Sequence, residues 1–215
     1  MGKNFFNKIV ISLSALTAAS FISCSNTVPQ IHNTSCSVVF DYSNYDELPQ
    51  ARLSIFVETN SNPRRFDSII VTCDQNEYIW EATDLILAAD DKNTYCGTTS
   101  LVMPANEQIP CGEYTITFHQ SDDEEEIIKR PLTYDKTPYT LKGKEISKSF
   151  SGERMLKIYG SEKEILYYGP RTAELKDARG IWNNYSNAVE FQESWIGQNG
   201  TVICNMPLEK VVPGN

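Results

Sequence analysis

Residues 110–119 read PCGEYTITFH, a proline and a glycine followed by a regular alternation of apolar and polar side chains. Successive residues of an extended chain point to opposite sides, so Tyr114, Ile116 and Phe118 share one face. A helix would place Ile116 on the side opposite to Tyr114 and Phe118. The segment therefore predicts a half-buried strand that begins after a turn.

The same alternation occurs earlier in the chain. It is present at 36–40, 53–57 and 78–82, and a denser apolar run covers Phe66–Cys73. Short stretches rich in Asn, Asp and Pro separate these runs, as turns do. Strands at short, regular spacing predict an antiparallel sandwich. The side chains expected in its core are Val38, Ile55, Val71, Trp80, Ile116 and Phe118.

The pattern Pro-x-Gly-x-Tyr followed by alternation resembles a late strand of bacterial immunoglobulin-like and fibronectin type III-like domains. Gly112 and Tyr114 carry this resemblance. It implies an all-β fold in which residues 35–140 form an antiparallel immunoglobulin-like sandwich.

A smaller β-rich portion, residues 151–215, is expected to follow the sandwich. Two short runs about Gly160 predict one hairpin, and two runs about residues 197–200 predict another. A short helix is predicted within 172–185, with Thr172 as the N-cap candidate. The polar stretch from Pro138 to Arg154 suits either a linker or a hairpin, so the sequence leaves open whether the second portion is a separate domain.

The N-terminus has the features of an export signal. Lys3 and Lys8 precede an uncharged, largely apolar stretch that ends at Cys24, which predicts a signal peptide over residues 1–23. The apolar stretch is shorter than the roughly 20 residues of a membrane-spanning helix. Ordinary cleavage near residues 18–20 is the alternative, and it would release a soluble protein.

Phe21-Ile22-Ser23-Cys24 resembles a lipobox of bacterial lipoproteins, with Phe21 in the place of the usual Leu, as in the relaxed lipoboxes of spirochaetes. The resemblance implies cleavage before Cys24 and lipid on that residue. Residues 24–34 are then a lipidated cysteine and a polar tether. The expected location is the cell envelope, on the outer membrane or cell surface, with the lipid on Cys24 as the contact with the membrane.

The charge of the chain excludes some partners. Its net charge is −9, and removal of Lys3 and Lys8 with the leader would make it more negative. Nucleic-acid binding requires a basic face, and anionic lipid headgroups also repel an acidic body. No nucleic-acid partner is expected.

Five cysteines follow Cys24. An oxidising compartment favours disulfides among them, and Cys96 and Cys111 are the closest pair in sequence. A disulfide between these two is therefore the expected one. A metal site is not expected, because the chain has no C-x-x-C spacing.

No catalytic constellation is found in the sequence. The chain has two histidines and lacks G-x-S-x-G, H-E-x-x-H and phosphate-binding glycine motifs. The leading expectation is a non-enzymatic binding module for a protein or glycan, without a cofactor. Tyr167 and Tyr168 are its candidate binding residues, because adjacent strand residues point to opposite faces and one ring is then exposed. The alternatives are a structural envelope lipoprotein and a glycan hydrolase.

Overall fold

The computed structural model describes residues 31–59, 63–76, 78–89, 93–105, 107–121 and 124–211, so the predicted leader and Cys24 lie outside the described residues. The described chain is mostly β-structure in two sheets, with two short α-helices, α2 (Gly143–Ser149) and α3 (Ala178–Asn184). No helix among these residues has the length and apolar character needed to cross a membrane.

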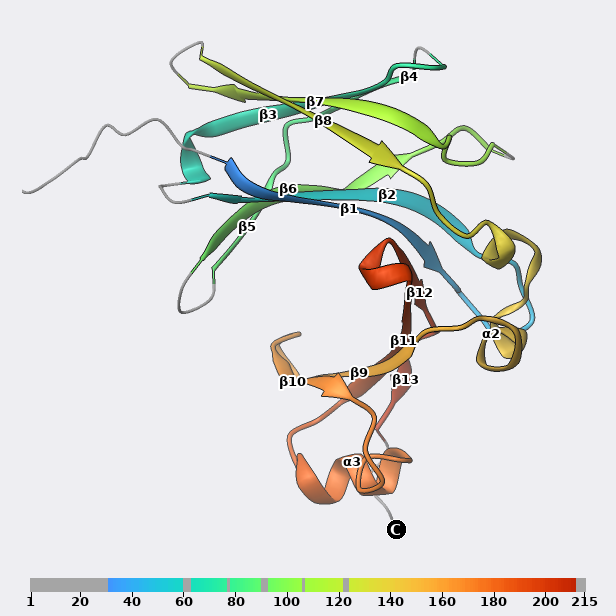
Figure 1. Ribbon diagram of the computed structural model, residues 1–215. Coiled ribbons are helices and arrows are strands. Elements are labelled where there is room, and N and C mark those ends of the chain that lie inside the picture. Colours follow the sequence, from blue (N-terminus) through green and yellow to red (C-terminus); the bar gives the residue numbers. More distant parts are fainter. Residues whose placement is uncertain are drawn as a thin grey trace, which may run out of the picture.

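Two four-stranded layers form a sandwich (Figure 1). One layer has the strand order β1-β2-β6-β5, and the other has the order β4-β3-β7-β8. Within each layer, neighbouring strands are antiparallel. These strands are β1 (Ile31–Asp41), β2 (Gln50–Thr59), β3 (Phe66–Cys73), β4 (Tyr78–Ala82), β5 (Ile86–Ala89), β6 (Thr94–Val102), β7 (Gly112–Gln120) and β8 (Glu125–Leu132).

The sandwich core confirms most of the predicted inward side chains. Those that are fully buried are Val38, Ile55, Val71, Ile116 and Phe118. Trp80 is only partly buried, because β4, which carries it, is an edge strand with β3 as its neighbour on one side only. Its ring stacks 5.8 Å from Tyr78 and 6.2 Å from Tyr114, and its Nε1 donates to the Val102 carbonyl at 2.8 Å.

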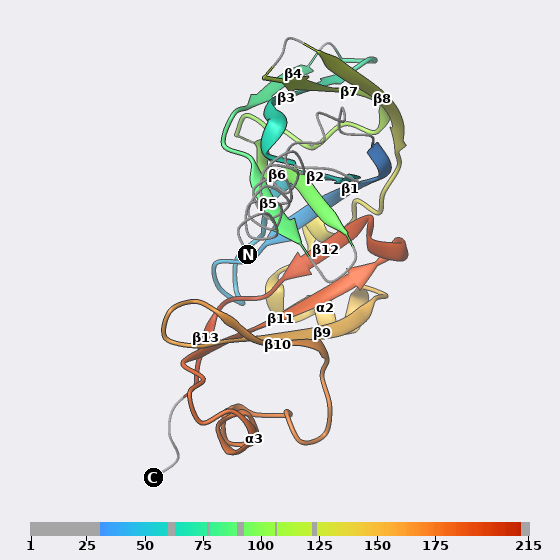
Figure 2. The ribbon, with the colours of Figure 1, turned by 90° about the vertical axis from the view of Figure 1, so that its left-hand side faces the viewer.

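The C-terminal portion extends the first layer of the sandwich instead of starting a new sheet. β12 runs parallel to β1, with Val38 opposite Val202. The whole sheet then has the order β10-β9-β11-β12-β1-β2-β6-β5, with β13 added beside β11 (Figure 2). The added strands are β9 (Glu153–Tyr159), β10 (Ile165–Pro170), β11 (Glu190–Gly197), β12 (Val202–Asn205) and β13 (Glu209–Lys210).

This portion has a small hydrophobic core of its own beneath α3 (Ala178–Asn184). Its buried members are Leu156, Ile158, Leu175, Ile181, Ala188, Phe191 and Val211. The two predicted hairpins are confirmed as β9–β10 and β11–β12, and the short 3₁₀ turn η4 (Gln198–Gly200) joins the second pair. The sandwich and the C-terminal portion thus share one sheet but have separate hydrophobic cores.

Three local predictions were wrong. The chain between the two portions is neither a linker nor a hairpin, because it forms η3 (Thr137–Thr140) and α2 (Gly143–Ser149), and Ile146 of α2 is buried in the sandwich core. The N-cap of α3 is Asp177, whose carboxylate accepts from the Gly180 N–H at 2.8 Å, and not Thr172. β1 begins at Ile31, so residues 31–34 of the predicted tether belong to a strand; pairing with β2 outweighs their polar composition.

Candidate binding surface

A row of mostly polar side chains crosses the face of the large sheet that is turned away from the sandwich core. Strand register places its members together: Tyr168 opposite Lys157, Lys157 opposite Gln192, and Asn205 opposite Asp41. Directly opposed residues of neighbouring strands share a face. We call this row the outer strip, and it consists of Tyr168, Lys157, Gln192, Asn205, Asp41 and Arg52.

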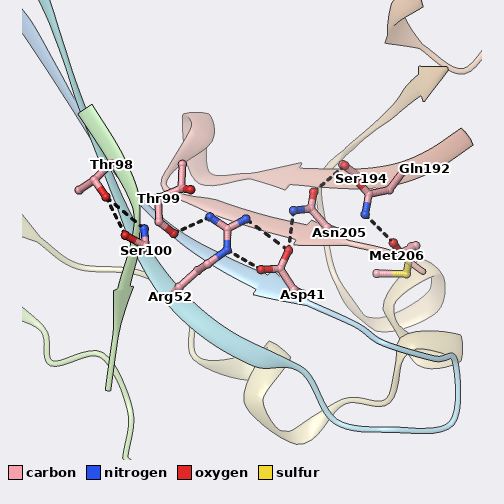
Figure 3. Close-up of polar contacts among 9 residues, drawn as sticks. All are labelled: Asp41, Arg52, Thr98, Thr99, Ser100, Gln192, Ser194, Asn205 and Met206. Atoms are coloured by element: carbon pink, nitrogen blue, oxygen red, sulfur yellow. Dashed lines mark hydrogen bonds and ion pairs between the residues drawn. The ribbon is translucent and has the colours of Figure 1, made fainter. Parts of the chain in front are cut away.

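Hydrogen bonds fix one end of the outer strip (Figure 3). Arg52 Nε donates to Asp41 Oδ2 at 2.5 Å, and Arg52 Nη1 donates to the Thr99 carbonyl at 2.8 Å. Asn205 Nδ2 donates to the other Asp41 oxygen at 2.8 Å, and Ser194 Oγ donates to Asn205 Oδ1 at 2.7 Å. Each side chain is held by a neighbour, so this end is fixed. Asp41 and Arg52 are partly exposed on it, whereas Asn205 and Ser194 are buried and support them.

The other end combines a cation with an aromatic ring. Lys157 Nζ lies 5.6 Å from the centre of the Tyr168 ring, within the range of a cation–π contact. Burial lowers the pKa of Lys157, and repulsion from Arg52 adds to this effect. Gln192 Nε2 donates to the Met206 carbonyl at 3.0 Å.

The two tyrosines predicted as binding residues lie on opposite faces of β10. Tyr168 is 54% exposed, whereas Tyr167 packs in the small core and donates its hydroxyl to the Pro170 carbonyl at 2.7 Å. A shift of register between Ile165 and Tyr167 brings Ile165, 61% exposed, onto the same face as Tyr168. The result is an apolar patch at the end of a polar row.

This sequence matches no family model, and no curated protein is significantly similar to it. Sequence reasoning missed the polar members of the outer strip, although each lies on the outward side of a strand with an alternating pattern. The alternating pattern does not predict which strands become neighbours in the sheet.

The predicted disulfide between Cys96 and Cys111 is absent, and all five described cysteines are free thiols. Cys96 lies in β6, whereas Cys111 directly precedes β7 in the opposite layer, so closeness in sequence does not bring them together. Burial raises the pKa of Cys96 to about 11 and that of Cys36 to about 12. The described residues also contain no group of metal-ligating side chains.

A second polar cluster lies on the inward side of the large sheet, where the two hydrophobic cores meet. Glu193 is nearly buried and accepts from Arg154 Nε and Nη2 at 2.8 and 2.9 Å. It also pairs with Arg171, and burial lowers the pKa of that guanidinium. A pocket of about 230 Å³ adjoins the cluster, with Trp195 in its wall. The cluster joins β9, β11 and the segment after β10, which is a structural role.

Proposed function

We propose that this protein is an exported lipoprotein, held on an envelope membrane by lipid on Cys24, and that it acts as a non-enzymatic binding module. The basic residues, the apolar stretch and the cysteine at its end support export and lipidation. The outer strip supports a binding role, because it places an exposed ring beside a fixed row of hydrogen-bonding groups.

We also propose that the sandwich is immunoglobulin-like. Its layers, β1-β2-β6-β5 and β4-β3-β7-β8, agree with the A-B-E-D and C′-C-F-G orders of immunoglobulin-type domains. The Tyr114 hydroxyl donates to the carbonyl of Pro110, four residues upstream, at 2.7 Å. This contact resembles the tyrosine corner found at the start of the F strand. An experimental structure with a different strand order would contradict the proposal.

The partner that the outer strip suits best is a protein. Tyrosine and arginine are enriched among the residues that dominate binding at protein interfaces, and such anchors work best beside apolar contacts. Tyr168 with Ile165 supplies such an anchor, and Arg52 lies at the far end of the strip. A glycan is the second candidate, because the row of hydrogen-bonding groups next to one ring also suits a sugar chain.

Replacement of Tyr168 by alanine should weaken partner binding by about tenfold or more, since the exposed ring is the main anchor of the strip. The measurement is a crosslinked pull-down from envelope extract, followed by titration of the recovered partner. Ile127→Ala is the matched control, because Ile127 is 59% exposed on β8, in the other sheet. Equal binding by wild type and Tyr168→Ala would show that the outer strip is not the site.

The Cys24→Ala variant should move from the membrane fraction to the soluble fraction and lose labelling by a fatty-acid probe. Each buried CH₂ of an acyl chain contributes about 0.8 kcal/mol, so removal of the acylated residue removes the anchor. Cys111→Ala should remain in the membrane and keep the label. A wild-type protein that never takes the label, together with a Cys24→Ala variant that stays membrane-bound, would contradict lipidation.

A further inference from the structure

A groove of about 620 Å³ opens along one side of the sandwich, between β1 and β8. Asn33–Ser37 of β1 form one wall, and Arg130 and Pro131 of β8 form the other. The η4 turn and the start of β12 close one end. No residue of the outer strip lines this groove, so it is a separate feature of the molecule.

Along the groove, one edge of β1 is open. β12 pairs with β1 only over residues 38–41, and no other described strand pairs with residues 33–37 on that side. The Val38 N–H donates to the Thr201 carbonyl at 2.8 Å, so the backbone groups of Val38 point away from β2. Along a strand, the backbone N–H and C=O groups of every second residue point to the same side. Residues 34 and 36 therefore point to the same side as Val38.

The backbone groups of Thr34 and Cys36 therefore point into the groove. The Thr34 N–H is taken by the Asn33 side chain, whose Oδ1 accepts it at 2.9 Å. The Cys36 N–H, the Cys36 carbonyl and the Thr34 carbonyl have no backbone partner within the described part of the chain, so they remain for another strand. Edges of this kind pair readily with an added chain.

Two residues that line the groove each have a buried side-chain atom without a hydrogen-bond partner among the described residues. These atoms are Nε of Arg130 and Oγ1 of Thr34. Arg130 lies on the inward face of β8 together with Leu132. Buried polar atoms in native proteins are nearly always hydrogen-bonded, and an unmade bond is costly. An acceptor supplied from outside would satisfy the Arg130 donor.

We propose that this groove binds an extended segment of a partner protein that carries a carboxylate side chain. The backbone of the segment pairs with Thr34 and Cys36, in the sheet position that β12 holds beside residues 38–41. The carboxylate accepts from Arg130 Nε, a charge-assisted hydrogen bond. Addition of a strand to an open edge is a recurring mode of peptide recognition.

The charge of the groove indicates which kind of segment can bind in it. Among the described residues that line the groove, Arg130 alone is charged. Residues 1–30 contain no Asp or Glu, so the chain's own N-terminal segment cannot supply the carboxylate. An inward-pointing charge on an edge strand can also prevent unwanted pairing with other strands. The test below distinguishes this protective role of Arg130 from a role in binding.

The test starts from a phage-displayed library of random nine-residue peptides, selected against the full chain in detergent. The most enriched peptide is then synthesised with both ends capped. We expect it to contain Asp or Glu, and we expect Arg130→Gln to weaken its binding by at least tenfold. In hydrogen-exchange measurements the Cys36 N–H should become protected on binding, whereas the Val38 N–H, already bonded to Thr201, should change little.

Lys129→Gln is the matched control, because Lys129 precedes Arg130 on β8, points to the opposite face and is 62% exposed. It should leave the affinity unchanged, and replacement of the peptide's acidic residue by its amide should repeat the loss seen with Arg130→Gln. Equal binding to Arg130→Gln and wild type, or a Cys36 N–H that still exchanges freely, would overturn the proposal. So would a selection that enriches no acidic peptide, and Arg130 would then be assigned to protection of the β8 edge.

Discussion

Phe118→Ala should lower the free energy of unfolding by about 3–5 kcal/mol, the usual cost of replacing a buried phenylalanine with alanine. Phe118 is fully buried in β7, and its ring lies 5.2 Å from that of Phe66. The substitution would leave a cavity, and the strands around it cannot move in to fill it, because β7 is hydrogen-bonded to β3 and β8 on either side. Since domains are stable by only about 5–15 kcal/mol, this loss is a large part of the total. Urea unfolding at equilibrium measures it.

Ile127→Ala provides the matched comparison for this loss. Ile127 lies opposite Thr117 on the neighbouring strand β8, but its side chain is 59% exposed. We expect its replacement to change the unfolding free energy by no more than about 0.5 kcal/mol. If the two variants unfold at the same urea concentration with the same slope, Phe118 is not part of a packed inter-sheet core.

Glu193→Ala should be destabilising by about 3–5 kcal/mol, as is typical when one partner of a buried ion pair is removed. Glu193 is the shared acceptor of Arg154 and Arg171, and the Arg171 side chain is only 12% exposed. Without the carboxylate, two cations face each other where the two hydrophobic cores meet. The segment after β10 should loosen first, because Arg171 holds it to the sheet.

Two further variants sharpen this prediction. Glu193→Gln keeps one acceptor oxygen and should cost less than Glu193→Ala. Glu153→Ala removes an exposed acid from β9, the strand that carries Arg154, and should have little effect. Urea unfolding, with proteolysis of the segment near Arg171 as a second readout, compares the three variants. A loss below about 1 kcal/mol for Glu193→Ala would mean that solvent screens the cluster as it does surface pairs.

The sequence alone predicted the features that depend on neighbours along the chain. Period-two alternation placed Ile116 and Phe118 on a buried face, and turn residues located the hairpins about Gly160 and residues 197–200. The same rule separated Tyr167 from Tyr168 by face. Each of these results follows from the geometry of an extended strand, in which side chains alternate regardless of what the strand pairs with.

Where the alternation was weak or absent, local reasoning failed. Polar composition suggested a tether at residues 31–34 and a linker or a hairpin before Arg154. Pairing with β2 instead makes the first a strand, and part of the second is the helix α2, whose Ile146 is buried. Cys96 and Cys111 are close in sequence, but they belong to opposite layers. In these places long-range contacts outweigh local preference.

Only the tertiary structure decided which strands meet. Asn205 Nδ2 reaches Asp41 across 164 residues of sequence because β12 docks in parallel beside β1. That one pairing joins the outer strip into a row. Because it covers only residues 38–41 of β1, the edge of β1 at Thr34 and Cys36 stays open, opposite Arg130. An alternating pattern fixes the face of a side chain but not the neighbour of its strand, because the choice of neighbour depends on how the whole sheet buries its apolar surface.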